Sequence, residues 1–293
     1  MRILITGAGG QLGRALQDAA VVAEHDCIFT DVVSGDNVSV LDVTDSVSVQ
    51  NFIKDNDVQA IVNCAGYTDV ERAENDADKS ALINTYAPSV LAKAAKENDL
   101  LMVHISTDYV FDGKKNTPYS ENDAPSPLNV YATTKLEGER AVISSGCRYV
   151  ILRTAWLYSC YGRNFFKTIV ERTAEYPSMK VVVDQVGTPT YAPDLASAIL
   201  NILGTDLSGK GGIYNYTGEG VCSWYDFAVA IRDAVGHICN IEPCLSCDYP
   251  SKAVRPHYSV LDKSKVKETF GLTVPHWTES LRMCIMDYDN MNQ

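Results

Sequence analysis

Tyr131 and Lys135, in the stretch YATTKLEGE, are the residues whose types and spacing first indicate chemistry. Four residues apart on a helix, a phenol and an ammonium lie on one face. A neighbouring cation favours the ionised phenol, and a tyrosine tuned in this way can give its proton to a substrate. We interpret Tyr131 as a candidate proton donor assisted by Lys135. The alternative is a pair without function that happens to share a helix face.

The chain holds a second Tyr-x-x-x-Lys match, YPSMK, from Tyr176 to Lys180. Here Pro177 directly follows the tyrosine and a β-rich run begins at Met179, which predicts a turn entering a strand. In that geometry the two side chains would not stack. Only the first match therefore indicates a catalytic pair.

Glycines follow the first apolar run, in ILITGAGGQLGRAL, and lead into a helical pattern; three of the four, Gly7, Gly10 and Gly13, are evenly spaced. Glycines let the backbone approach a pyrophosphate, and a helix N-terminus supplies N–H groups and a positive dipole end. The spacing is G-x-x-G-x-x-G, and a strict G-x-G-x-x-G frame would place Leu12 at the third glycine. An ordinary strand-to-helix turn is the alternative. The candidate cofactor-binding residues are Gly7, Gly10, Gln11, Leu12 and Gly13.

Asp31 ends the second expected strand, at the place where an acid can accept hydrogen bonds from an adenosine ribose. A carboxylate there disfavours a 2′-phosphate and suits NADH. Arg14 could compensate, so the sequence leaves both NADH and NADPH open. A solvated aspartate at a strand end is the alternative.

Polar and small residues also end the next three expected strands. Ligands bind at the carboxyl ends of parallel strands, so we expect these residues to extend the same site. Asp42 and Val43 could flank an adenine or simply precede a helix, and Cys64, Ala65 and Gly66 would leave room for a cofactor or simply make a turn. Thr107 would present a hydroxyl, unless that hydroxyl bonds to its own backbone.

The elements that must position these residues alternate between strands and helices, which predicts a parallel sheet covered on both sides. Helix 79–98 contains Pro88, so a kink or a late start is expected. The expected strands are 2–6, 27–32, 38–43, 60–64, 100–106, 149–154 and 180–184, and the expected helices are 11–23, 46–56, 79–98, 129–144, 164–174, 194–203 and 223–235. We predict a Rossmann-type doubly wound α/β domain over 1–156, and over 157–293 mainly a smaller substrate-binding lobe, interleaved with the end of the sheet.

The composition limits the classes of partner that the chain is expected to bind. The 293 residues are 46% hydrophobic with a net charge of −12 and a pI of about 4.8, which argues against nucleic acid and anionic membranes. No apolar run is long enough to span a membrane, and a cytoplasmic location is expected. The nine cysteines are an odd number, which favours reduced thiols over a disulfide framework. The roles of Cys239, Cys244 and Cys247, in HICNIEPCLSC, stay open between a zinc site and a packed loop.

ITGAGGQLG, ISTDYVFDG and YATTK, in this order, resemble the extended short-chain dehydrogenase/reductase family. RTAWLYS, DQVGTPT, SWYDFA and RPHYSVLDKSK narrow the resemblance to its dTDP-4-dehydrorhamnose reductases, over nearly the full length. The resemblance implies an oxidoreductase of dTDP-rhamnose and cell-wall polysaccharide biosynthesis. Such an enzyme reduces the C4 ketone of dTDP-4-dehydro-L-rhamnose with NADPH or NADH.

The resemblance also implies residue roles. Tyr131 corresponds to the proton donor, Lys135 to its partner and Thr107 to the hydroxyl that helps to hold the substrate carbonyl. The positions implied to contact the nucleotide-sugar substrate are Thr68, Val70, Thr107, Asp108, Trp156 and Arg255, the last of which would bind the diphosphate. Arg255 has no carboxylate within a helical turn, which also favours an anionic ligand.

Some family members bridge a dimer through Mg²⁺ bound by glutamates, but Ala15 stands at the corresponding position of the first helix. We therefore predict no metal, and either a monomer or a homodimer. Two other functions remain open: a reductase or epimerase of another nucleotide 4-keto sugar, and a non-catalytic subunit similar to the β subunit of methionine adenosyltransferase.

Overall fold

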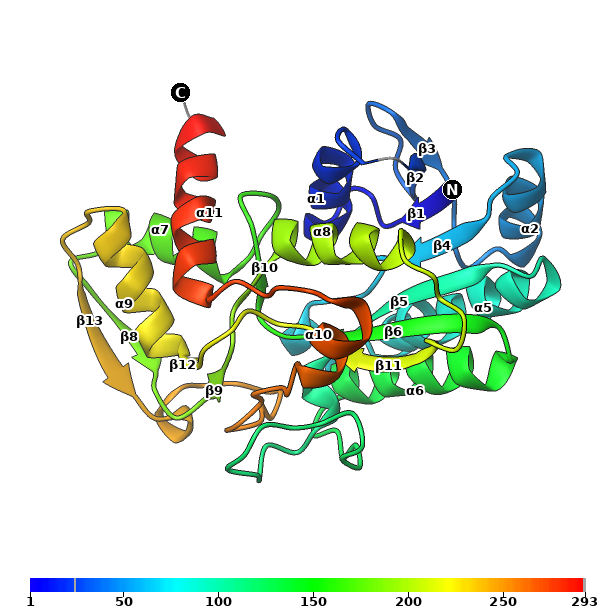
Figure 1. Cartoon of the computed structure of the whole chain (residues 1–293). Coiled ribbons are helices and arrows are strands. Elements are labelled where there is room, and N and C mark those ends of the chain that lie inside the picture. The colour runs from blue at the N-terminus through cyan, green and yellow to red at the C-terminus, as the bar shows by residue number, and fades with distance from the viewer. Residues whose placement is uncertain (24, 292–293) are drawn as a thin grey trace.

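A parallel sheet of seven strands forms the centre of the computed structural model, which describes residues 1–23 and 25–291 (Figure 1). The strand order is β11-β6-β5-β4-β1-β2-β3. This order reverses direction between β1 and β4, which is the doubly wound Rossmann arrangement that the sequence predicts. The strands are β1 (Arg2–Thr6), β2 (Asp26–Asp31), β3 (Val38–Val40), β4 (Ala60–Asn63), β5 (Leu101–Thr107), β6 (Arg148–Thr154) and β11 (Gly212–Asn215).

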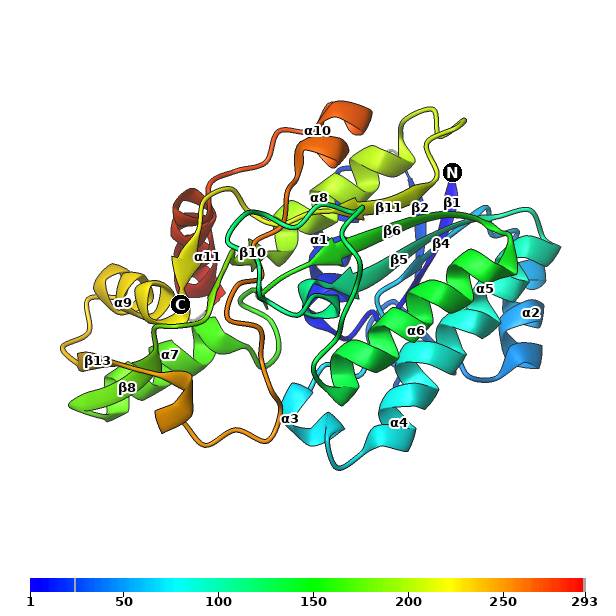
Figure 2. The ribbon, with the colours of Figure 1, turned by 90° about the horizontal axis from the view of Figure 1, so that it is seen from below.

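Helices cover both faces of this sheet, and the central strands are apolar on both sides. Along β1, Ile3 and Ile5 pack into one core and Leu4 into the other, as alternating side chains of a doubly covered strand must. Figure 2 shows α5 and α6 side by side on one face and α1 and α8 on the other. One core includes α1 (Gln11–Ala20), α8 (Ala192–Leu203) and α10 (Ser264–Phe270), and the other includes α2 (Ser46–Asp55), α5 (Ala87–Glu97) and α6 (Val130–Ser145).

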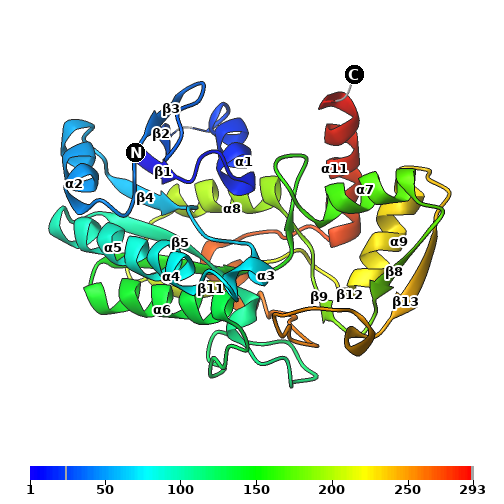
Figure 3. The same cartoon turned by 180° about the vertical axis from the view of Figure 1, so that it is seen from behind.

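A smaller lobe lies beside the carboxyl ends of the sheet strands (Figures 1 and 3). Its core contains several aromatic side chains, of which Tyr158, Phe166 and Phe227 are almost fully buried. The lobe contains α7 (Phe165–Glu175), α9 (Trp224–Ala234), α11 (Trp277–Met291) and the strand pairs β8 (Ser178–Val182) with β13 (Asn240–Cys244), β7 (Leu157–Tyr158) with β10 (Thr190–Tyr191), and β9 (Val186–Gly187) with β12 (Cys222–Ser223).

The expected helix 79–98 is divided. α4 (Ala77–Ala81) runs into a π-helical turn, η1 (Leu82–Tyr86), and α5 then begins at Ala87. Pro88 lies just after this π-helical turn, at the start of α5. The irregularity expected at Pro88 is present as the π-helical turn, but the helix does not start late, because the helical run continues from Ala77 to Glu97.

Other boundaries differ from the expectation. β3 ends at Val40 and not at Val43, while YPSMK does enter a strand, β8. Several short elements were not anticipated: α3 (Val70–Ala73), η2 (Asp108–Val110), η3 (Ser246–Asp248), β13 and α10. The longer helix α11 was not anticipated either. Within residues 1–23 and 25–291, no helix combines the length and apolar character that a membrane span requires.

Candidate active site

The backbone geometry of the turn between β1 and α1 explains the spacing of its glycines. Gly7 has φ +69°, and a Cβ on it would lie 2.6 Å from the Ala65 nitrogen. A Cβ on Gly13 would lie 2.3 Å from the Gly7 carbonyl oxygen, so the third glycine lets α1 pack against the turn. Gly10 is the N-cap of α1 and makes no side-chain capping hydrogen bond. The first N–H groups of α1 therefore remain free. Together with the turn from Gly7 to Gly13 they form a glycine cradle that could accept a pyrophosphate.

Asp31 closes one side of this cradle. Its carboxylate accepts hydrogen bonds from the backbone N–H of Gly9, at 2.9 Å, and of Val32, at 2.7 Å. Arg14 is exposed, with its guanidinium 5.6 Å from the centre of the Tyr161 ring. An acid is thus placed for a ribose, with an exposed cation one turn into α1.

Gln11 and Leu12 point in different directions from the start of α1. The Gln11 Oε1 accepts hydrogen bonds from Ser159 Oγ and Asn164 Nδ2, at 3.1 and 2.9 Å, and so ties the glycine turn to the smaller lobe. Leu12 is buried in the sheet core. Gln11 and Leu12 thus anchor the cradle from both sides.

The residues that follow β3 and β4 were both expected at the cofactor site. The exposed Asp42 accepts hydrogen bonds from the Thr44 N–H and hydroxyl, at 2.8 and 2.7 Å, whereas Val43 is buried. The cap of α2 is Asp45 and not Asp42. Cys64, Ala65 and Gly66 turn the chain beside Gly7, and burial raises the pKa of Cys64 to about 12.

Tyr131 and Lys135 lie four residues apart in the first turns of α6, as the sequence predicts. Asn129 caps this helix through a 2.8 Å hydrogen bond from the Ala132 N–H. The Lys135 ammonium is buried beneath Gly66 and donates to the backbone carbonyl of Ile105 in β5.

Burial dominates the proton chemistry of this pair. It raises the pKa of Tyr131 to about 12, although a hydrogen bond from Thr107 acts in the opposite direction. Burial also lowers the pKa of Lys135 to about 8, against the charges of Glu139 and Cys64. The net shift at Tyr131 is therefore opposite to the lowering that we expected from Lys135, because the ammonium is turned toward Ile105 and Cys64.

Thr107 and Asp108 complete a polar group beneath Tyr131. The Thr107 hydroxyl donates to Asp108 Oδ1 at 3.1 Å and accepts from the Tyr109 N–H at 3.2 Å, so part of its hydrogen bonding is local. Asp108 is 2% exposed, and burial raises its pKa to about 7, although hydrogen bonds from Ser259 and Thr107 lower it in part. Its Oδ2 atom is buried without a hydrogen-bond partner among the described residues. A carboxyl that titrates near neutral pH therefore lies close to the Tyr131 phenol.

Asn84, which the sequence did not single out, fixes the loop that carries Thr68. From the π-helical turn η1, its side chain accepts from the Tyr67 N–H at 2.8 Å and donates to the Tyr67 carbonyl at 3.0 Å. It also contacts the Thr134 hydroxyl, which donates to the Tyr131 carbonyl at 2.9 Å. Thr68 is exposed on this loop, and the half-buried Val70 begins α3. The loop and α6 thus share one hydrogen-bond network.

Trp156 stands in an unusual backbone conformation, with φ +48°. Its indole stacks on that of Trp224, with ring centres 3.5 Å apart and planes 8° from parallel. A Cβ on Gly187 would come within 2.7 Å of the Trp156 ring, so this glycine makes room for the stack. Trp156 is thus packed against α9 of the smaller lobe, which carries Trp224.

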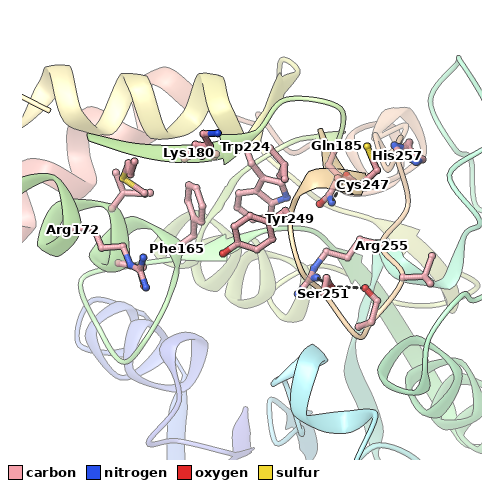
Figure 4. A pocket seen from close by; sticks show the side chains of 18 of the residues that line it. Phe165, Arg172, Lys180, Gln185, Trp224, Cys247, Tyr249, Ser251, Arg255 and His257 are labelled. Atoms are coloured by element: carbon pink, nitrogen blue, oxygen red, sulfur yellow. Dashed lines mark hydrogen bonds between the residues drawn. The ribbon is translucent and has the colours of Figure 1, made fainter. Parts of the chain in front are cut away.

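A cavity of about 880 Å³ opens beside Trp224 (Figure 4). It is lined by α7, β8, Trp224 and the segment 246–257, and among the residues expected to touch substrate only Arg255 lines it. None of its described lining residues is an aspartate or glutamate, although the chain carries a net charge of −12. The lining includes the basic side chains Arg163, Arg172, Lys180, Arg255 and His257 and the aromatic side chains Phe165, Tyr176, Trp224 and Tyr249.

Arg255 does have a carboxylate partner, contrary to the expectation from the sequence. Its NH1 atom lies 2.6 Å from Oε1 of Glu71, and it donates to Ser251 Oγ at 2.5 Å. The partner was missed because Glu71 is close to Arg255 only in space. Even so, Arg255 lines the cavity with its side chain 24% exposed.

The remaining candidates concern metal binding: Ala15 in α1 and the cysteines. Ala15 is buried in the sheet core. The nine cysteines are free, and no group of three His, Cys, Asp or Glu residues capable of holding a metal occurs in 1–23 and 25–291. Cys239 is buried and Cys247 is exposed at the cavity.

The chain matches the family described as the RmlD substrate binding domain over residues 1–290. A dTDP-4-dehydrorhamnose reductase from Aggregatibacter actinomycetemcomitans is 39% identical to it, over 96% of this chain and 97% of the relative. The crystal structure of a dTDP-4-dehydrorhamnose reductase from Clostridium acetobutylicum has a TM-score of 0.92 at 40% identity, with 100% of both chains covered. A Bacillus anthracis dTDP-4-dehydrorhamnose reductase in complex with NADP has a TM-score of 0.89 at 34% identity, covering 98% of this chain and 99% of its own. These likenesses confirm the resemblance found in the sequence, and the chain belongs to the RmlD substrate binding domain family.

Proposed function

We propose that the protein reduces the C4 ketone of dTDP-4-dehydro-L-rhamnose to the alcohol of dTDP-L-rhamnose, with NADPH or NADH as the reductant. The relatives named dTDP-4-dehydrorhamnose reductase support this reaction. The observation that carries the proposal is the placement of Tyr131, Lys135 and Thr107 at the carboxyl edge of the sheet, beside a glycine cradle that fits a pyrophosphate.

Reduction requires a hydride at the carbonyl carbon and a proton at its oxygen. A bound reduced nicotinamide would supply the hydride. The Tyr131 phenol would give the proton, and the Thr107 hydroxyl, which donates to Asp108 Oδ1 in this structure, would donate to the oxygen instead as negative charge develops there. The buried Lys135 ammonium adds positive charge beneath the same site, and it would favour the phenolate once it turns from Ile105.

The cavity supports a nucleotide as the other part of the substrate. Arginines suit a diphosphate because they offer several N–H donors in a planar fork, and aromatic rings stack on a base. The cavity holds both kinds of side chain without a carboxylate among its described lining. The sugar would then lie at the boundary, between the cavity and Tyr131, where the loop with Thr68 and Val70 and the ring of Trp156 also stand.

Asp31 bears on the choice of cofactor. Its carboxylate faces the glycine turn, where a ribose hydroxyl would be accepted and a 2′-phosphate would be repelled. The NADP complex of the Bacillus anthracis relative nevertheless supports NADPH for this chain. The exposed guanidinium of Arg14 is the cation nearest in sequence that could offset Asp31.

The direct test is oxidation of NADPH and NADH with enzymatically generated dTDP-4-dehydrorhamnose, comparing the wild type with Tyr131→Phe. We expect turnover in the wild type, and a fall in kcat of roughly 10²- to 10⁴-fold in the variant with cofactor affinity retained, because only the proton donor is lost. NMR of the product should show dTDP-L-rhamnose.

Three results would contradict the proposal. Turnover with a different 4-keto sugar but not with this one would assign another substrate. An unchanged kcat in Tyr131→Phe would assign another proton donor. Binding of nucleotide without hydride transfer to any such sugar would favour a regulatory subunit.

A further inference from the structure

A short strap, residues Ser251 to Arg255, separates the cavity from the catalytic helix. Ser251, Val254 and Arg255 line the cavity, and Arg255 donates to Ser251 across the strap (Figure 4). Ala253 is buried at its centre. The strap therefore carries the cavity cation Arg255. Three side chains from residues 1–156 bond to it: Glu71, Asn129 and, through the exposed Lys252 ammonium at 3.3 Å, Asn75. The first two contact the strap next to Arg255.

Glu71 is the first of these side chains. One carboxylate accepts hydrogen bonds from Ser251 Oγ at 2.6 Å and from the Lys252 N–H at 3.0 Å, and lies 2.6 Å from Arg255 NH1. Burial acts to raise the pKa of Glu71, but these donors outweigh it and leave the pKa lowered. Glu71 directly follows Val70 in α3, so the strap is tied to the loop expected to face the sugar.

Asn129 is the second side chain that holds the strap. Its Oδ1 caps α6 by accepting from the Ala132 N–H at 2.8 Å, while its Nδ2 donates to the Val254 carbonyl of the strap at 2.9 Å. Asn129 is 7% exposed and lies two residues before Tyr131 in the chain. The residue that starts the catalytic helix thus also fixes the backbone beside Arg255.

We propose that Glu71 and Asn129 are positioning residues that hold the strap and its Arg255 in register with α6, so that a nucleoside diphosphate in the cavity brings its sugar to Tyr131. The inference rests on the proposed function for the assignment of the cavity to a nucleotide. It adds two residues that touch neither the reacting atoms nor the cofactor cradle and act through Arg255 and the strap backbone.

Glu71 also has an electrostatic effect that opposes its positioning effect. Its negative charge neutralises Arg255 and repels a diphosphate, so its removal could strengthen binding. The Glu71 side chain is 42% exposed, so solvent and salt screen that repulsion, whereas the hydrogen bonds to the strap are short and several. We therefore expect the loss of positioning to exceed the relief of repulsion.

The test compares two variants with a control. Glu71→Gln removes the charge at nearly constant shape. Asn129→Asp keeps the capping oxygen but cannot donate to the Val254 carbonyl. The control is Glu137→Gln on α6, since Glu137 is also an ion-paired glutamate, 2.5 Å from Arg140, with a side chain 45% exposed. The measurements are the Kd of dTDP and of NADPH by calorimetry, kcat and KM for the sugar nucleotide, and the melting temperature.

For both test variants we expect about a tenfold rise in the Kd of dTDP and in the KM for the sugar nucleotide, with the Kd of NADPH and the melting temperature near those of the wild type. The control should match the wild type throughout. In an Arg255→Gln background, which itself weakens dTDP binding, adding Glu71→Gln should change the Kd of dTDP less than twofold, because Glu71 acts through Arg255.

Several results would overturn the inference. These are unchanged or tighter binding of dTDP in both variants, equal losses of dTDP and NADPH affinity with a lowered melting temperature, or full additivity with Arg255→Gln. The dTDP measurement does not require turnover. A wild type that binds dTDP but fails to reduce the sugar would contradict the proposed function alone, and a wild type that does not bind dTDP would contradict the strap's role as well.

Discussion

Lys135 shows how burial sets the chemistry of a single residue in this site. Its pKa is lowered to about 8, because the loss of water around the ammonium outweighs the charges of Glu139 and Cys64. The ammonium is the form that can stabilise a phenolate, and it is lost as the pH rises through that value. The charged fraction of Lys135 is therefore largest below pH 8, unlike that of an ordinary lysine.

We expect kcat/KM, which reports groups of the free enzyme, to fall as the pH rises through about 8. A pH profile of the wild type from pH 6 to pH 10 measures this, and Lys135→Arg is the matched variant. Arginine stays charged, with a pKa above about 12, so any activity that the variant retains should lack this alkaline limb. A wild-type profile that is flat to pH 10 would show that Lys135 keeps its charge.

Sequence patterns predicted those site residues that lie close together along one element or at the ends of neighbouring strands. Tyr131, Lys135, Thr107 and the glycines belong to this group, because helix periodicity and strand polarity place them. Glu71, Asn84 and Asn129 escaped notice, since each acts through hydrogen bonds to segments distant in the sequence. No periodicity or spacing reports such contacts.

Gly138 shows how one element constrains another. It lies in the middle of α6, where a glycine weakens helix propensity, yet the helix runs through it to Ser145. A Cβ at Gly138 would lie 2.1 Å from the backbone carbonyl oxygen of Asn84, in the π-helical turn. The glycine thus allows the π-helical turn η1 to approach α6.

Gly138→Ala should destabilise the fold by about 2 kcal/mol. Alanine would gain about 1 kcal/mol of helix propensity, but the overlap with a backbone atom forces η1 and α6 apart at a larger cost. Denaturant unfolding measures the change, and Ser144→Ala, on the exposed face of α6, is the control for propensity. A more stable Gly138→Ala variant would mean that η1 moves aside without cost.

The elements themselves were predicted where their patterns are long. Strands β1, β4, β5 and β6 are buried apolar runs, and the helices of the Rossmann half have either a cap or a regular apolar face. The two-residue strands β7, β9, β10 and β12 are too short to show a period, so only tertiary contacts define them. The π-helical turn likewise has no sequence signal beyond the proline that follows it.

At the scale of the whole molecule, the smaller lobe and the sheet are interwoven along the chain. α8 and β11 come from the second half, yet α8 fills the core beneath Ile3 and Ile5, and β11 pairs with β6 at the edge of the sheet. α10 adds Val266 and Phe270 to the same core. The sequence predicted this interleaving in outline, but not which helix would cover the sheet.

A fragment of residues 1–156 should therefore fail to form a stable domain. Without α8 and α10, one apolar face of the sheet would be open to water, and such surfaces promote aggregation. Size-exclusion chromatography and hydrogen exchange of the fragment measure this, with the full chain as the control. Co-expression with residues 157–293 should restore a soluble complex. A fragment that is monomeric and protected in β1 and β4 would show that the sheet folds alone.

The stacked pair of Trp156 and Trp224 has an optical consequence. The chain has three tryptophans, and two of them lie face to face at 3.5 Å beside the cavity. Indole transitions in such a sandwich couple as an exciton, which gives a paired circular-dichroism band and shifted, partly quenched emission. Because Trp224 lines the cavity, a base that stacks on it or parts the two rings would change this signal. The protein thus contains a label-free spectroscopic reporter of whether its cavity is filled.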